Sequence, residues 1–238
     1  MNGLAAFLVA ALMLVPALVI AIPLHELGHA LAAYFLGDRS VRYFGYFDLS
    51  PSKVRRLFDP LGLLAVFIAL VGWGRKVPVQ PNRISTMRQK VLYELGGPAA
   101  NLLGALLFGV ILRVLLRNGG VPSVASPLDL LTFALYAIWF LNVSIFAFQL
   151  LPVPGLDGWA IVEALFRNRN PRFFFNVSTR RQQIWIGVIL VIFIGSVIRV
   201  PVLNLVMSPF YTPASLISLG TCIGYGVPNF NALAPCLL

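Results

Sequence analysis

The chain contains two histidines, and they lie four residues apart in the sequence His25-Glu26-Leu27-Gly28-His29. Positions i and i+4 of an α-helix are separated by about 40° around the axis, so both imidazoles lie on one face. Two neutral imidazoles at this spacing can bind one Zn²⁺, and Glu26 lies beside them, close enough to act on a water molecule at the metal. The pentapeptide therefore predicts a zinc-binding helix.

A third ligand must come from elsewhere, because a catalytic zinc usually has three protein ligands and one open position. Asp157 is the candidate, since it follows a long apolar run directly. Taken alone, the sequence Pro154-Gly155-Leu156-Asp157-Gly158 is more typical of a turn, for which Asp-Gly is ordinary. Paired with the histidine motif, Asp157 is better interpreted as a metal ligand.

Short patterns of the form H-E-x-x-H also occur by chance on soluble helices. Here the motif lies inside an apolar run, where a carboxylate costs about 2.5–3.5 kcal/mol at mid-bilayer. A bound divalent cation supplies a reason for that cost, and the chain has no other histidine. The alternative is a structural cluster of polar side chains without a metal.

The composition indicates which kind of protein must position these residues. Of the 238 residues, 59% are hydrophobic and only 11% are charged. A soluble domain needs more charge to cover its surface, and the apolar residues come in long runs, so the lipid bilayer is the expected environment. The net charge of +10 does not indicate nucleic acid as a partner, because the basic residues lie between apolar runs and not on one soluble module.

Apolar runs of spanning length cover residues 3–36, 91–116, 128–151 and 184–207. The first run is longer than a bilayer needs, so it must tilt, break or project, and Pro16 and Pro23 are its natural break points, because each removes a helix hydrogen bond.

Two shorter features lie between the first and second of these runs. Residues 61–74 are apolar but too few to span easily, which is typical of a re-entrant or interfacial segment, and the alternation over 41–49 weakly favours a strand. We therefore predict an all-α polytopic membrane protein with about four to five transmembrane helices. A small re-entrant or β-like element is expected between the first and second full spans.

Basic residues predict the orientation of these spans, because cytoplasmic loops carry an excess of Lys and Arg. Ten lie between residues 37 and 90 and five between residues 152 and 182, which makes 15 of 18. If segment 61–74 does not cross, all 15 lie on one side. The prediction is then that these loops are cytoplasmic and that both termini lie outside.

Three motifs together resemble the site-2 protease family of intramembrane metalloproteases. They are the histidine motif, the sequence Gly97-Pro98-Ala99-Ala100-Asn101, which is similar to the family's G-P-x-x-N, and the Leu156-Asp157-Gly158 element after a proline-rich approach. The sequences Asp59-Pro60-Leu61-Gly62 and Gly72-Trp73-Gly74-Arg75-Lys76-Val77-Pro78-Val79 resemble a compact bacterial branch without a PDZ domain. The resemblance covers about residues 4–165.

The resemblance implies that His25, His29 and Asp157 bind one Zn²⁺ and that Glu26 is the general base. It also implies cleavage of membrane-embedded protein or peptide substrates, with the active site nearer the cytoplasmic side of a bacterial cell membrane. We assign residues 1–165 to the metalloprotease core. Residues 166–238 are expected to form a basic loop, one more transmembrane helix and an uncharged tail.

Three carboxamides and the Gly-Pro pair are candidates for substrate binding. The family commonly has Asn three residues before the first proline of its approach, where this chain has Gln149. Asn142 lies seven residues earlier, on nearly the same helix face. Asn101, Asn142 and Gln149 can hold substrate or can hydrogen-bond between spans, and Gly97-Pro98 can instead start a helix.

Other functional classes remain open. A membrane transporter or channel would also carry buried charges, and an inactive member would act as a membrane scaffold. The transporter hypothesis does not explain the grouped histidine motif with a distant aspartate, and the complete set of ligands and base argues against an inactive scaffold. The sequence specifies neither the substrate and the oligomeric state nor whether Cys222 and Cys236 pair.

Overall fold

The computed structural model describes residues 3–116, 127–198 and 200–220, and in these ranges it is all helical. The long helices are α1 (Gly3–Phe35), α5 (Met87–Leu116), α6 (Pro127–Gln149), α9 (Arg181–Val197) and α10 (Val202–Leu219). The shorter ones are α2 (Ser40–Tyr43), α3 (Pro51–Val54), the 3₁₀ helix η1 (Arg55–Leu57), α4 (Pro60–Ala69), α7 (Asp157–Phe166) and α8 (Pro171–Thr179).

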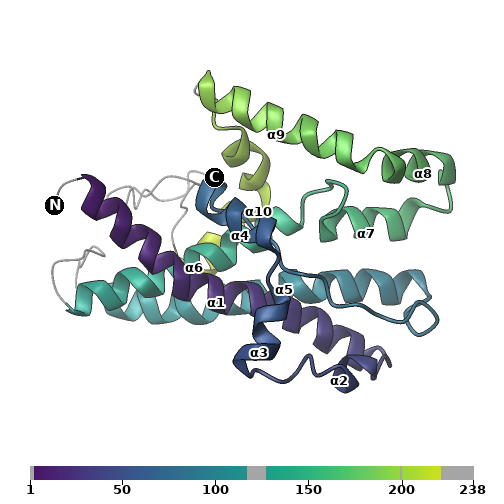
Figure 1. The fold of residues 1–238 in the computed structure, drawn as a ribbon, viewed down its shortest axis with the longest axis horizontal. Helices are drawn as coiled ribbons and strands as arrows, with labels where there is room; N and C mark the ends of the chain where they lie inside the picture. The colour runs from purple at the N-terminus through teal and green to yellow at the C-terminus, as the bar shows by residue number, and fades with distance from the viewer. Residues whose placement is uncertain (1–2, 117–126, 199, 221–238) are drawn as a thin grey trace.

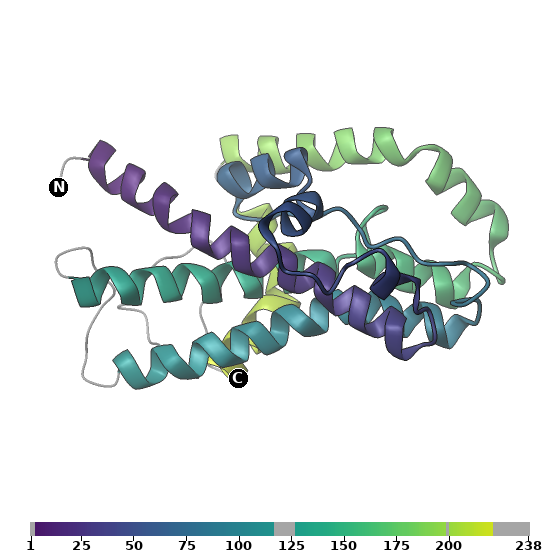
Figure 2. The ribbon, with the colours of Figure 1, turned by 60° about the horizontal axis from the view of Figure 1, so that its bottom comes forward.

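Helices α1, α5 and α6 pack against one another as the centre of the molecule (Figures 1 and 2). Helix α10 packs on α5 and α6, and α7 packs on α5. Four described helices are long and apolar enough to cross a membrane, over residues 14–35, 87–115, 130–149 and 202–219. The predicted polytopic all-α membrane protein is therefore confirmed.

Two glycines bring α1 and α5 into close contact beside the histidine motif. A Cβ atom on Gly28 would lie 2.3 Å from the carbonyl oxygen of Gly96, and one on Gly96 would lie 2.7 Å from the carbonyl oxygen of Gly28. Small residues at such crossings let membrane helices approach closely. This contact sets the separation between the helix of the histidines and the helix of the Gly-Pro motif.

The predicted breaks in the first apolar run do not occur. Helix α1 continues through Pro16 and Pro23, and Pro98 lies inside α5 rather than at its start. A proline removes one backbone hydrogen bond, and membrane helices tolerate that loss where neighbouring helices pack around them.

The segment between α1 and α5 differs from the predicted strand over residues 41–49, and it agrees with the prediction that residues 61–74 are too few to span easily. Residues 41–49 do not form a strand: α2 begins at Ser40, and a turn follows with Gly45 at φ +70°. The polypeptide reverses within this turn, where the Tyr46 N–H donates to the Val41 carbonyl at 3.1 Å. Helix α4 has 10 residues, a length of about 15 Å, which is too short to cross a hydrocarbon core of about 30 Å.

The prediction of one span over residues 184–207 is wrong, because the helix ends inside this range. Helix α9 ends at Val197, and α10 begins at Val202, directly after Pro201. The Val200 N–H donates a hydrogen bond to the Gly195 carbonyl at 2.8 Å, and Pro201 has no N–H with which to continue the helix. Helices α8 and α9 form a pair bent by 71°. Cys222 and Cys236 lie outside the described residues.

Candidate metal centre

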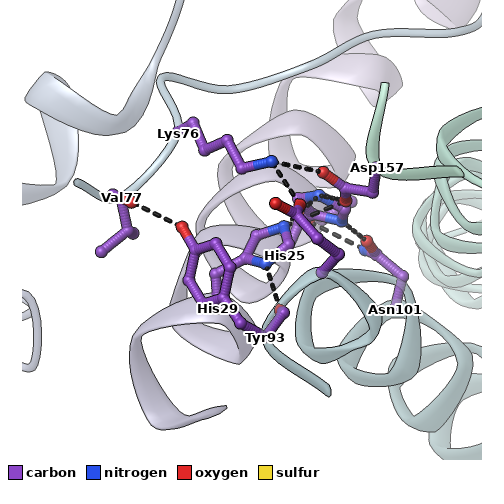
Figure 3. Close-up of polar contacts among 9 residues, drawn as sticks. His25, His29, Lys76, Val77, Tyr93, Asn101 and Asp157 are labelled. Atoms are coloured by element: carbon purple, nitrogen blue, oxygen red, sulfur yellow. Dashed lines mark hydrogen bonds and ion pairs between the residues drawn. The ribbon is translucent and has the colours of Figure 1, made fainter. Parts of the chain in front are cut away.

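Three buried side chains from two helices, His25, His29 and Asp157, converge on one another (Figure 3). His25 and His29 lie one turn apart on α1, and Asp157 is the first residue of α7. Asp157 Oδ2 lies 3.1 Å from His25 Nε2 and 3.0 Å from His29 Nε2, and the two Nε2 atoms are 3.2 Å apart. The structure therefore brings together the three ligands predicted from the sequence.

These distances fit a zinc ion. Tetrahedral zinc with ligand bonds of about 2.0–2.1 Å places neighbouring ligand atoms about 3.3 Å apart. The three residues are at most 4% exposed, so bulk water does not hydrogen-bond to the lone pairs that face one another. Within the described ranges, this is the one group of His, Cys, Asp and Glu side chains whose ligand atoms converge in this way.

The other ring nitrogen of each histidine is bound by α5. His25 Nδ1 donates to Asn101 Oδ1 at 2.6 Å, and His29 Nδ1 donates to the Tyr93 carbonyl at 2.9 Å. A ring that carries its proton on Nδ1 keeps its Nε2 lone pair available for a metal. These hydrogen bonds therefore set both the tautomer and the orientation of the two imidazoles.

Further hydrogen bonds hold the side chain of Asn101 in place. Its amide nitrogen donates to the Ala21 carbonyl and to Asn142 Oδ1, each at 2.9 Å, and Asn142 in turn donates to the Ile138 carbonyl at 2.8 Å. The two asparagines thus link α1, α5 and α6 behind His25. Contact of Asn101 or Asn142 with substrate stays a prediction, as it does for Gln149, which is buried at the last turn of α6.

Gly97 leaves room for the imidazoles. A Cβ atom at this position would lie 2.3 Å from His29 Nε2 and 2.6 Å from His25 Nε2. Even a methyl group would therefore occupy the space beside both ligand atoms. Gly97 therefore faces the ligands from α5, and Pro98 continues the helix one residue later; contact of either residue with substrate stays a prediction.

Glu26 is 3% exposed, and its side chain extends from α1 toward the segment that follows α4. A Cβ atom on Gly74 would lie 2.5 Å from Glu26 Oε1, so this glycine leaves room for the carboxylate. Among the described residues, Glu26 Oε2 has no hydrogen-bond partner. A buried carboxylate oxygen without a partner beside a metal centre is suited to accepting a proton from a reactant.

A search of characterised sequences finds relatives along most of the chain. "Putative zinc metalloprotease YwhC" of Bacillus subtilis (strain 168) is 35% identical over 199 residues, which cover 80% of this chain and 85% of the relative. The chain belongs to this family of zinc metalloproteases. The buried His-His-Asp group, which could hold a metal ion, and the neighbouring Glu26 are therefore the candidate active site of this metalloprotease.

Two mycobacterial relatives are also named as zinc metalloproteases. Each is named "Putative zinc metalloprotease Rip2". The protein from Mycolicibacterium smegmatis is 38% identical over 143 residues, which are 59% of this chain and 52% of the relative. The protein from Mycobacterium tuberculosis (H37Rv) is 34% identical over 164 residues, which are 67% of this chain and 60% of the relative. No family model and no solved structure matches the chain.

Two charged residues of the metalloprotease were not predicted as part of the site. Lys76 Nζ lies 3.3 Å from Asp157 Oδ1 and forms an ion pair with Glu94. Burial alone would lower the pKa of Lys76, but the two carboxylates outweigh it and hold that pKa above its usual value. Lys76 is therefore a cation at neutral pH. The sequence offered a weak signal, since Lys76 lies inside the tryptophan-containing motif and Glu94 lies three residues before Gly97.

The loop that ends at Asp157 is held by a residue from α9. Trp185 Nε1 donates to the Pro154 carbonyl at 2.7 Å, and its ring lies 5.9 Å from the ring of Trp73. Gly155 has φ +106°, which favours glycine, and turns the chain toward α7. The metalloprotease site thus depends on a helix beyond the region that carries the family motifs.

Proposed function

We propose that this metalloprotease is of the site-2 type and hydrolyses peptide bonds of membrane-embedded protein or peptide substrates, as in regulated intramembrane proteolysis, with one Zn²⁺ per chain. The observation that carries the proposal is the depth of the site. His25, Glu26 and His29 all lie within the candidate span of residues 14–35, and each is at most 3% exposed.

The residues have separate roles in this proposal. His25, His29 and Asp157 would hold the zinc ion, which supplies Lewis acidity that polarises the scissile carbonyl and makes water more acidic. Glu26 accepts the proton of the attacking water and passes it to the leaving nitrogen. Burial of the four side chains excludes bulk water, which strengthens each of these electrostatic interactions.

We also propose that the site lies toward the cytoplasmic side of a bacterial cell membrane. Support comes from the basic loops next to Lys76 and α7, because positive loops stay inside. Both termini lie outside if the bent pair α8–α9 does not cross the membrane, whereas a fifth crossing by this pair would bring the C-terminal end inside.

The proposal is tested with purified wild type, Glu26→Gln and His25→Ala in lipid vesicles that contain a transmembrane substrate. Glu26→Gln is expected to keep its zinc and lose at least about 100-fold in kcat, because a general base contributes about 10²–10⁴-fold. His25→Ala is expected to lose the zinc. Glu163→Gln, on the outer side of α7 beside Arg167, is the matched control and should cleave normally.

Two results would contradict this function. Cleavage by Glu26→Gln at the wild-type rate would remove Glu26 as the base. Zinc flux into the vesicles without proteolysis would favour the transporter hypothesis, and zinc binding with neither flux nor cleavage would favour the inactive scaffold.

A further inference from the structure

The two oxygens of the Asp157 carboxylate have different neighbours. Oδ2 lies 3.0–3.1 Å from the histidine nitrogens, whereas Oδ1 lies 3.3 Å from Lys76 Nζ (Figure 3). A carboxylate can bind a metal through one oxygen or through both. The ammonium group of Lys76 is therefore paired with the oxygen of Asp157 that does not face the histidines, and competes with a metal for that oxygen.

Lys76 does not reach this place as a free surface side chain. The backbone on either side of it is anchored: the Arg75 N–H donates to the Leu57 carbonyl at 2.7 Å, and the Tyr93 hydroxyl donates to the Val77 carbonyl. Phe58 and Gly74 form an antiparallel bridge just before it. These contacts fix the point from which the Lys76 side chain extends across the active site.

Glu94 holds the ammonium group from the other side. It lies on α5 one residue after Tyr93, whose carbonyl accepts the proton of His29 Nδ1. Its side chain is 12% exposed and that of Lys76 is 45% exposed, so the pair is partly shielded from water. A charge pair in such a position restricts the lysine side chain more than a solvated surface pair does.

We propose that Lys76, held by Glu94, is a positioning residue for the metal ligand Asp157, and that it keeps one carboxylate oxygen turned toward the two histidines. The inference rests on the proposed function, since it assigns a role at the same site. It adds a charged link that runs from α5 through the loop before it to the first residue of α7.

The competing explanation is that Lys76 is only one of the basic residues that orient the protein in the membrane. In that case any exposed lysine of the same region would be equivalent. Lys90 is the matched control, because it is exposed on α5 one turn before Glu94 and its replacement removes the same charge.

The first measurement is zinc affinity by chelator competition on the purified full chain, which requires no substrate. Lys76→Met is expected to weaken zinc binding by about 10–100-fold, the usual cost of removing a group that orients a metal ligand. Lys76→Arg, which keeps a cation with several donors, should recover most of the affinity. Lys90→Met should bind zinc as wild type does.

Two further readouts separate positioning from a general loss of structure. The visible spectrum of the Co²⁺-substituted protein should change in Lys76→Met and not in Lys90→Met, because the spectrum reports how the ligands are arranged around the metal. With substrate, kcat should fall while KM stays near the wild-type value. Glu94→Gln should show the same changes to a smaller extent, since Lys76 itself is kept.

Wild-type zinc affinity and an unchanged Co²⁺ spectrum in Lys76→Met would overturn the inference. If Lys76→Met does not fold, Glu94→Gln decides in its place, and unchanged metal binding in that variant would overturn it equally. Because zinc affinity is measured without substrate, failure of the inference is distinguishable from failure of the proposed function, which would appear as an absence of cleavage by wild type.

Discussion

At the residue scale, each imidazole of the site uses both of its nitrogens. One nitrogen of His25 and of His29 is bound to α5, and the other faces Asp157. The spacing of the two histidines was sufficient to predict their convergence, because a helix fixes the angle between positions i and i+4. Asp157 could be predicted only together with the histidine motif, since its own local pattern is more typical of a turn residue than of a ligand.

The contacts of Lys76 with Glu94 and Asp157 could not be predicted from the sequence alone. Lys76 and Glu94 are 18 residues apart, one on a loop and the other on α5, and Lys76 is 81 residues from Asp157. The three residues lie on a loop, on α5 and on α7, so no single helical or strand repeat joins them and their meeting depends on the tertiary path of the chain. The same holds for the Asn101–Asn142 hydrogen bond, which forms between α5 and α6.

Gly97 provides a prediction at this scale. In Gly97→Ala the new methyl group would meet both Nε2 atoms, so the zinc content of the purified protein should fall from about one per chain to near zero. The variant should still fold, because Ala is favoured over Gly in a helix interior by about 1 kcal/mol. Zinc analysis and thermal unfolding measure these two effects.

The control for Gly97→Ala is Gly187→Ala on α9. Among the described residues nothing lies within 4 Å of a Cβ atom at Gly187. This variant should keep both zinc and activity. A folded Gly97→Ala protein with full zinc content would show that the ligands are not as close to α5 as described.

At the scale of elements, long apolar helices were predicted well and breaks were not. Helices α5 and α6 lie within a few residues of their predicted bounds. The prolines of α1 do not break it, whereas Pro201 does separate α9 from α10. The difference is packing: α1 lies against α5 and α6, and its neighbours compensate for lost hydrogen bonds in a way that a sequence pattern does not express.

Trp185 provides a prediction at this scale, because it connects α9 to the loop before Asp157. Trp185→Phe keeps an aromatic ring against Trp73 and removes the hydrogen bond to the Pro154 carbonyl. A hydrogen bond contributes about 1 kcal/mol, so zinc affinity should fall by at most roughly five-fold. Chelator competition measures this change.

Trp159→Phe is the control for Trp185→Phe. Trp159 lies on α7 and packs against Phe173 and Phe174, on the side of the α7–α8 connection. The same substitution there should leave zinc affinity unchanged. Equal losses in both variants would mean that the effect comes from general destabilisation and not from the loop.

At the scale of the whole molecule, a metal at this site would join α1 to α7 across 128 residues of sequence. Binding to the folded state alone raises its stability by about 2.7 kcal/mol when free zinc is 100-fold above Kd. For a chain of this size that corresponds to roughly 5–10 °C in Tm. Chelation of the purified wild type should therefore lower Tm by an amount in this range.

The metal-removal prediction has a direct control. Asp157→Ala lacks the ligand from α7, so its Tm should respond little to the chelator. If chelation strips zinc from wild type and leaves Tm unchanged, the metal does not join these two helices.

The order of the ligands along the chain has a consequence for biosynthesis. His25 and His29 enter the membrane with the first helix, whereas Asp157 follows only after α5 and α6. A nascent chain that still lacks α7 holds the two imidazoles and Glu26 but not Asp157, the third proposed ligand. Under the proposed function, hydrolysis therefore begins only after translation has passed Asp157.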